Sequence, residues 1–190
     1  MQEKEHPHAD VRQSKAVEGY DPALPVTRYE IAATLYQLLV QSEAAAAQPG
    51  RIAREVKPGR KSNLTPNPSK AKRYSDVPAS HWAKASLQGV GARGINVVTS
   101  AKFEGDKSVT GDELAGWLDG LAGWIEGRPA TAKSLAELVQ VGYVPQTHPV
   151  LQKKNKPVSA QEASSLMVEV LVRAQERTNT ASADSRYGKQ

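Results

Sequence analysis

The chain has 190 residues, enough for one compact domain or a few small modules that share a core. Its hydrophobic share is 39%, and no run approaches the roughly 18 uninterrupted apolar residues of a membrane-spanning helix, so we expect no transmembrane segment. The sequence contains no cysteine, which excludes a disulfide framework and a thiolate metal site. The net charge of +5 is concentrated in one segment.

The N-terminal residues give little structural signal. Residues 1–8 are polar and are expected to form a flexible terminus. The first five are charged or polar after Met1 and include no apolar stretch, so no secretory signal is visible. Residues 9–18 could supply a short first helix.

A five-residue pattern then occurs three times: valine, a hydroxyl residue, two residues of any kind, and glutamate. In a capping box the hydroxyl accepts from the backbone N–H three residues later, the glutamate accepts from the N–H of the hydroxyl residue, and the preceding apolar residue packs on the new helix. Three copies predict one structural unit used three times. The copies are Val26-Thr27-Arg28-Tyr29-Glu30, Val109-Thr110-Gly111-Asp112-Glu113 and Val158-Ser159-Ala160-Gln161-Glu162.

Each pattern opens an apolar run with helical spacing. Short helices are marginal alone, so the three apolar stripes are expected to pack into one shared core. Upstream of the second and third runs, a helical stretch ends at Gly94 or Gly142, which suits a left-handed cap followed by a short extended piece. The stripes are Ile31, Leu35, Leu38 and Leu39; Leu114, Trp117, Leu118, Leu121, Trp124 and Ile125; and Ala163, Leu166, Met167, Val170, Leu171 and Ala174.

Residues 46–73 are expected to form a basic insertion rich in proline, glycine and polar residues. Between positions 51 and 73 the net charge is +7, against −2 for the rest of the chain. A charged linker is one interpretation, and a contact strip for an anionic partner is the other. We do not expect nucleic-acid binding, because the basic run has no aromatic residues and no nucleic-acid-reading fold is apparent. The basic residues are Arg51, Arg54, Lys57, Arg60, Lys61, Lys70, Lys72 and Arg73.

No motif predicts catalysis, a metal or a cofactor. Residues 89–94 match G-x-G-x-x-G, but a dinucleotide loop needs a strand before it and a helix after it, whereas here His81 to Gln88 predicts a preceding helix. Metalloprotease and nucleophile-elbow motifs are absent, and so are paired carboxylates in a defined pocket. The histidines His6, His8, His81 and His148 lack metal-binding spacing on a helix face. The chain is therefore expected not to be an enzyme.

The middle unit resembles an S-layer homology (SLH) motif. That motif reads roughly aromatic-x-D-V-P-x-x-H-W-A, a glycine turn, a loop, and T-R-A-E opening a second helix. The middle unit has Tyr74-Ser75-Asp76-Val77-Pro78-Ala79-Ser80-His81-Trp82-Ala83, then Gly94-Ile95, then Val109 to Leu114. The first unit has Gly19-Tyr20-Asp21-Pro22 and Pro25 to Glu30, and the third is recognisable by its helix pair and Pro157 to Glu162.

The resemblance implies a mainly α fold, with three SLH-like helix-loop-helix motifs in a pseudo-threefold arrangement around a shared helical core, and short extended segments. It divides the chain into a flexible N-terminus (1–8), a shortened first motif (9–45), the insertion (46–73), a second motif (74–127), a third motif (128–176) and a polar C-terminal tail (177–190). The same resemblance implies a cell-envelope location outside the cytoplasm, with the cytoplasmic side as the alternative.

For function, the resemblance implies non-enzymatic anchoring, in which grooves between motifs bind peptidoglycan-linked glycan or a secondary wall polymer. Guanidinium groups can hold acidic sugars, and indoles offer a flat face to sugar rings. The motif arginine is Arg28 in the first unit but Gly111 and Ala160 in the others. The alternative is a degenerate scaffold subunit of a large assembly, which contacts other envelope proteins. The expected glycan or partner contacts are Arg28, Glu30, Asp76, His81 and Trp82.

Two of these residues also have structural interpretations. Trp82 could be a core indole at the start of a helix. Asp76 could be a cap or turn acceptor just before Pro78.

Overall fold

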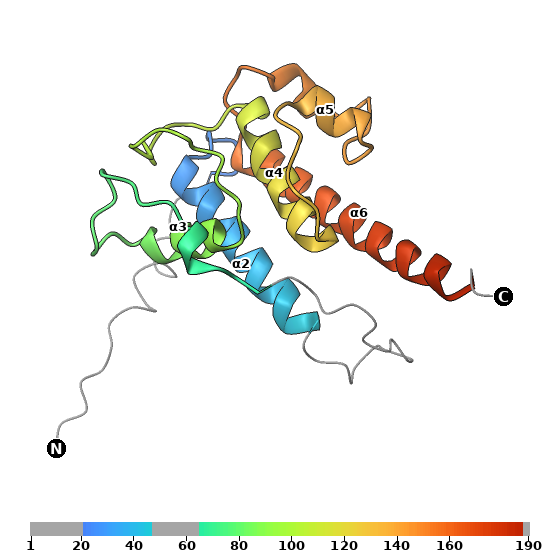
Figure 1. Ribbon diagram of the computed structural model, residues 1–190. Helices are drawn as coiled ribbons and strands as arrows, with labels where there is room; N and C mark the ends of the chain where they lie inside the picture. The colour runs from blue at the N-terminus through green and yellow to red at the C-terminus, as the bar shows by residue number, and fades with distance from the viewer. Residues whose placement is uncertain (1–20, 47–64, 188–190) are drawn as a thin grey trace.

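A computed structural model describes residues 21–46 and 65–187. This part of the chain is mainly helical, which confirms that the fold is mainly α (Figure 1). α2 packs with α3, and α4 packs with both α5 and α6. The helices are α2 (Arg28–Ala46), α3 (Lys84–Ala92), α4 (Gly111–Glu126), α5 (Leu135–Gln140) and α6 (Ala160–Tyr187), with 3-10 helices η1 (Pro68–Lys70) and η2 (Pro149–Lys153).

The three predicted helix starts are confirmed, because α2, α4 and α6 each begin directly after their hydroxyl residue. The first start is a complete capping box: Thr27 N donates to Glu30 Oε2 at 2.8 Å, and Glu30 N donates to Thr27 Oγ1 at 3.3 Å. The third repeats it, with Ser159 N to Glu162 Oε2 at 2.8 Å and Glu162 N to Ser159 Oγ at 3.2 Å. These bonds satisfy amides that would otherwise lack a partner in the first helical turn.

The second start makes only half of this box. Glu113 N donates to Thr110 Oγ1 at 3.4 Å, but the Glu113 carboxylate turns away to Arg28. The prediction of three equal capping boxes is therefore wrong at Glu113, and the reason is a competing charge from another unit.

The three valines that precede the caps form a closed ring of backbone hydrogen bonds. Val26 N donates to Val158 O at 2.9 Å, Val158 N to Val109 O at 3.0 Å, and Val109 N to Val26 O at 2.9 Å. All three side chains are buried. The ring therefore ties the N-terminal ends of α2, α4 and α6 together.

The loops before these helices extend the same cycle. Arg28 N, in the first turn of α2, donates to Lys107 O in the loop before α4 at 3.1 Å. Asp112 N in α4 donates to Lys154 O, in the loop before α6, at 3.0 Å. Gln161 N in α6 donates to Pro22 O, in the segment before α2, at 3.0 Å, so each helix start is capped by the loop of another unit.

One hydrophobic core takes residues from all three predicted stripes, which confirms the expected shared core. Leu38, Trp124 and Ile125 are only partly buried and pack at its edge. Loop and turn residues such as Phe103 and Tyr143 complete the core and are fully buried. These loop side chains fill the space between the helices, so the core also depends on how the loops are arranged.

Local turn geometry agrees with the sequence at the two glycines but not in the segments after them. Gly94 and Gly142 have φ of 81° and 78°, which confirms the predicted left-handed caps. Only isolated bridges occur in the described ranges, so the extended pieces expected after these glycines do not form strands. α3 begins at Lys84 rather than His81, because a turn with a hydrogen bond from His81 N to Pro78 O precedes it. Gly89 lies inside this helix, which agrees with the rejection of a dinucleotide loop.

The insertion and the C-terminus differ in part from expectation. Residues 1–20 and 47–64, including Arg51, Arg54, Lys57, Arg60 and Lys61, lie outside the described part of the chain. Residues 65–73 pack on α3, where Asn67 N donates to Ala92 O at 2.8 Å, so this end of the expected insertion belongs to the fold. α6 continues through Tyr187, beyond the expected end of the third motif. In the two described ranges, no helix is long and apolar enough to cross a membrane.

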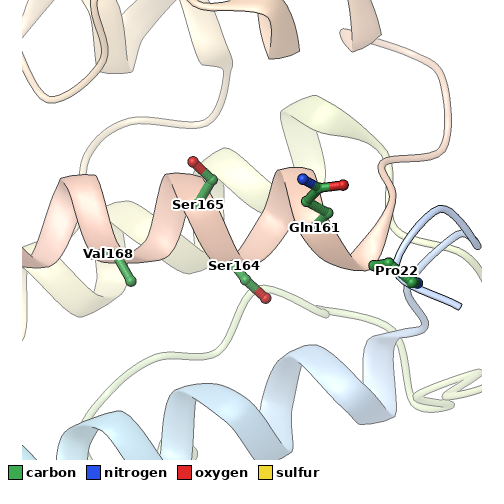
Figure 2. A pocket seen from close by; sticks show the side chains of 5 residues that line it. All are labelled: Pro22, Gln161, Ser164, Ser165 and Val168. Atoms are coloured by element: carbon green, nitrogen blue, oxygen red, sulfur yellow. The ribbon is translucent and has the colours of Figure 1, made fainter. Parts of the chain in front are cut away.

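A hollow of about 610 Å³ lies along one face of α6, lined by Pro22, Gln161, Ser164, Ser165 and Val168 (Figure 2). Val168 is 55% exposed, although it is a large apolar residue. The described helices therefore leave part of the α6 surface uncovered.

Candidate functional site

A groove of about 770 Å³ is lined by residues from all three units, most of them from the second. Residues 94–100 form one wall and residues 130–133 form the other. Asp112, Glu113, Gly116 and Gly120 of α4 lie between them, and Arg28 reaches the groove from α2. This volume is within the range of small-molecule binding sites.

Arg28 is held by protein atoms and is only 9% exposed. Its Nε donates to Glu113 Oε1 at 2.5 Å, and its Nη1 donates to Phe103 O at 2.7 Å and lies 3.4 Å from Glu104 Oε2. A positive charge in the first turn of a helix is unfavourable, because that end of the helix is itself partially positive. The Glu113 carboxylate offsets this charge, which explains why it leaves its own capping box.

The equivalent position in the second unit is closed by packing. A Cβ atom on Gly111 would lie 2.6 Å from Lys153 O and 2.7 Å from Leu135 Cδ1. An arginine could not occupy this position without a backbone shift. The third unit has Ala160 there, so only the first unit presents the motif arginine.

Asp76 fixes the loop that holds Arg28. Its carboxylate accepts from Phe103 N at 2.8 Å and from Glu104 N at 2.7 Å, in a loop 27 and 28 residues further along the chain, rather than from a cap or turn next to Pro78 as predicted. Burial alone would raise the pKa of Asp76, but backbone hydrogen bonds from Phe103, Glu104 and its own N–H, together with the charge of Lys102, lower the pKa below its ordinary value. Glu104 has φ of 52°, so these bonds hold a strained residue in place.

An aromatic cluster lies beside this loop, where Tyr29 N donates to Gly105 O at 3.0 Å. The Tyr29 and His81 rings are stacked with centroids 4.4 Å apart, and the Trp82 ring lies 5.6 Å from each. Trp82 is 48% exposed, so the core-indole interpretation is wrong; neighbouring Ala83 is the buried residue of this turn. Burial and the charges of Asp76 and Asp106 raise the pKa of Tyr29. The cluster therefore exposes the Trp82 indole, while the Tyr29 side chain is buried.

Four of the five predicted contacts lie around residues 103–105: Arg28, Asp76, His81 and Trp82. Glu30 does not join them, because its carboxylate is occupied by the Thr27 cap. Of the predicted basic strip, Lys70, Lys72 and Arg73 are described. Lys72 Nζ donates to Thr99 O at the groove wall and lies 5.6 Å from the centre of the Tyr74 ring.

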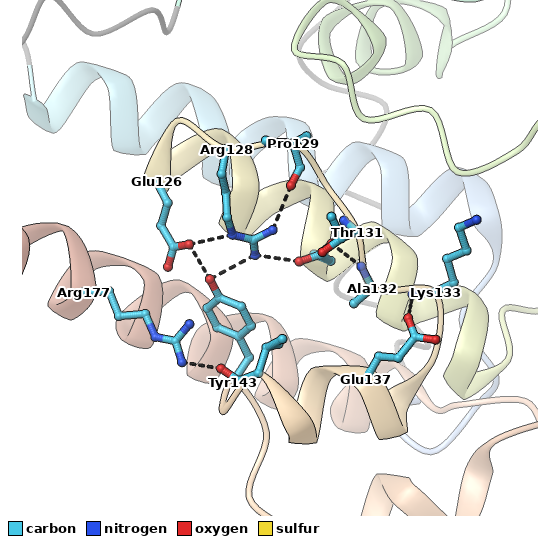
Figure 3. Close-up of polar contacts among 11 residues, drawn as sticks. Glu126, Arg128, Pro129, Thr131, Ala132, Lys133, Glu137, Tyr143 and Arg177 are labelled. Atoms are coloured by element: carbon cyan, nitrogen blue, oxygen red, sulfur yellow. Dashed lines mark hydrogen bonds and ion pairs between the residues drawn. The ribbon is translucent and has the colours of Figure 1, made fainter.

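The opposite wall depends on Asp119, which the sequence did not predict. Figure 3 shows the surrounding network, in which Arg128 contacts Glu126 and Tyr143. Asp119 is fully buried and accepts from Arg128 Nη2 at 2.6 Å, from Ala132 N at 2.7 Å and from Thr131 N. Burial alone would lower the pKa of Arg128, but hydrogen bonds to Asp119, Tyr143 and Glu126 raise it overall. Asp119 therefore fixes residues 131 and 132, which face the groove. The sequence feature that could have identified Asp119 is its position as a carboxylate inside an apolar helical run.

Within the ranges that the structure describes, no group of three or more histidine, aspartate and glutamate side chains could hold a metal ion. Comparisons with protein-family models, with curated proteins and with solved structures find no match to this chain. The groove and the aromatic cluster are therefore the candidate functional surfaces of the described chain.

Proposed function

We propose that the three units are SLH-like motifs in a pseudo-threefold arrangement. The ring of hydrogen bonds among Val26, Val109 and Val158 supports this proposal, because each valine donates to one partner and accepts from the other. The cyclic exchange of loop carbonyls between units supports it further. In this arrangement, binding grooves lie between neighbouring units.

We further propose that the chain is a non-enzymatic anchoring module that binds cell-wall glycan in the groove at Arg28, outside the cytoplasmic membrane. The observation that carries this proposal is the state of the Arg28 guanidinium. Its Nε and Nη1 bind protein atoms, while its Nη2 makes no hydrogen bond to any residue that the structure describes. A pre-oriented donor at the edge of a polar groove suits a sugar carboxylate or hydroxyl.

The surroundings supply the other elements of sugar recognition. Thr99, Ser100, Thr131 and Lys133 line the groove and offer donors and acceptors to sugar hydroxyls. Trp82 offers a flat, half-exposed face in the aromatic cluster beside residues 103–105. A glycan longer than one ring could contact both surfaces.

Cosedimentation with purified wall glycan tests this function. We expect the full chain to pellet with the glycan, and Trp82→Ala and Arg28→Ala each to weaken pelleting about tenfold, equivalent to about 1.4 kcal/mol. Arg173→Ala is the matched control, because it removes the same charge from a half-buried arginine on α6 that lies outside the groove. No pelleting of the wild type, or equal loss in the control, would contradict glycan binding in this groove.

The second candidate is a scaffold subunit of a large assembly that acts through protein-protein contacts. The tight packing at Gly111 favours it, since one of the three grooves cannot accept the motif arginine. Gentle isolation followed by size-exclusion chromatography distinguishes the two functions. A large complex without glycan affinity supports the scaffold, and a monodisperse monomer that binds glycan contradicts it.

A further inference from the structure

Arg28 and Arg93 bind a glutamate with the same edge of the guanidinium, but Arg28 uses only half of it. A guanidinium presents its Nε and Nη2 donors side by side, so one carboxylate can accept from both. Arg93 makes this double contact, with Nε to Glu43 Oε1 at 2.7 Å and Nη2 to Glu43 Oε2 at 2.5 Å. Arg28 donates to Glu113 through Nε alone, and its Nη2 has no hydrogen-bond partner in the described ranges. A carboxylate that filled this edge would therefore make one hydrogen bond more than Glu113 does.

The place that Glu113 leaves at its own helix start is open. In the other two units, Thr27 N and Ser159 N each donate to the glutamate of the capping box at 2.8 Å. Thr110 N is the equivalent amide, and it has no hydrogen-bond partner among the residues that the structure describes. Glu113 is three residues from Thr110, as in the other two boxes, so a side-chain rotation can bring its carboxylate to this amide.

Both partners of the ion pair face the groove. Arg28 and Glu113 are among its lining residues, and their side chains are 11% and 16% exposed. A carboxylate on a ligand in the groove could accept from Nε and Nη2 together, in the stronger bidentate arrangement. A neutral hydroxyl has no charge to replace that of Glu113, so it would leave the Arg28 guanidinium without a counter-ion.

We propose that Glu113 is an internal competitor for the ligand and thereby determines its specificity. A ligand carboxylate takes the Nε and Nη2 edge of Arg28, and Glu113 moves to Thr110 N, where it completes the second capping box. The exchange replaces one charge pair with another and adds a helix cap, so it favours an acidic sugar over a neutral one. This role of Glu113 rests on the proposed glycan binding in the groove.

Hydrogen exchange of the Thr110 amide, followed by NMR on the full chain, tests the movement of Glu113. The acidic probe is sodium glucuronate, and glucuronamide at matched sodium chloride is its neutral counterpart. Saturating glucuronate should slow the exchange about tenfold, because the amide gains a hydrogen bond, and glucuronamide should not. Arg28→Met should slow the exchange of the same amide without any ligand, because the Glu113 carboxylate is then free to accept from it.

The affinity of Glu113→Gln for glucuronate tests the competition. Glutamine can still serve in a capping box but carries no charge. With the internal charge removed, we expect titration calorimetry to show glucuronate binding about ten times more tightly than to the wild type. Glu162→Gln is the matched control, since it removes the same charge from the third capping box, and it should leave the Kd unchanged. If Glu113→Gln does not fold, the exchange measurements on the wild type and on Arg28→Met decide the question.

Each contrary outcome overturns the proposal. If the wild type pellets with wall glycan but Glu113→Gln binds glucuronate no more tightly, glycan binding stands and Glu113 is not a competitor. If Thr110 exchange changes neither with glucuronate nor in Arg28→Met, Glu113 has no second place to bind. If glucuronamide binds as well as glucuronate, or if neither binds, the groove does not select acidic sugars. If wall glycan itself fails to pellet with the chain, the proposed function fails, and Arg28→Met still shows whether Glu113 can move to Thr110.

Discussion

The ion pair between Arg28 and Glu113 makes a sharp prediction about stability. Its side chains are 11% and 16% exposed, and the Nε to Oε1 distance is 2.5 Å. Removing one partner of a buried ion pair leaves the other charge unpaired, which typically costs about 3–5 kcal/mol. Since this pair keeps some solvent contact, we expect Glu113→Gln to lower the free energy of unfolding by about 3 kcal/mol, at the low end of that range.

Glu162→Gln is the matched control, because Glu162 has the same place in the third unit but accepts from Ser159 N in a complete capping box. Losing a cap costs about 1 kcal/mol. Arg28→Met should also cost less than Glu113→Gln. The freed Glu113 carboxylate lies three residues from Thr110 and can complete the second capping box.

Urea unfolding followed by circular dichroism at neutral pH measures all three variants. The expected difference of about 2 kcal/mol between Glu113→Gln and Glu162→Gln corresponds to a midpoint shift of about 1 M or more. If Glu113→Gln costs no more than Glu162→Gln, the ion pair does not stabilise the junction between the units. If Arg28→Met is the more damaging variant, the capping argument fails.

Three further predictions follow from other contacts. Asp119→Asn should lower the free energy of unfolding by about 3 kcal/mol, because Arg128 then loses its buried partner; a loss below that of Glu162→Gln in urea unfolding would contradict this. Gly105→Ala should cost about 1–3 kcal/mol by calorimetry, because its Cβ would lie 2.1 Å from the Tyr29 ring, whereas Gly116→Ala, at 3.2 Å from Val97, should be nearly neutral. Stability should fall as pH drops below about 4, because the pKa of Asp76 is lowered by folding and its contribution is lost on protonation. A pH series of unfolding should show a shallower fall in Asp76→Asn, and an unchanged slope would refute that assignment.

The sequence predicted what depends on local chemistry. Each helix start followed from a hydroxyl residue, a valine and a glutamate close together, and the stripes followed from helical spacing. The left-handed glycines Gly94 and Gly142 followed from their place after a helix. These features depend on interactions between residues close together in the chain, so the sequence pattern is enough to predict them.

Long-range charge placement could not be predicted in this way. The partner of Arg28 is 85 residues away, and the capping pattern assigned Glu113 to Thr110 instead. The motif identified Trp82 but did not predict its burial. Whether Trp82 or Ala83 faces the core depends on the turn before α3. Asp119 was hidden in an apolar run, since its partners come from a loop that had no recognisable pattern.

The junctions between units therefore differ in how much space they leave for a ligand beside the start of the helix. At Gly111 the helix start packs directly on Lys153 and Leu135, with no space for a longer side chain. At Arg28 the equivalent junction is polar and opens on a groove, and its carboxylate, Glu113, has a second place to bind at Thr110. An acidic group of a ligand that pairs with Arg28 would release Glu113 to the position that Glu30 and Glu162 hold in their own units. The new cap would offset part of the cost of breaking the ion pair, so the first junction is the one best suited to exchange an internal carboxylate for an external one.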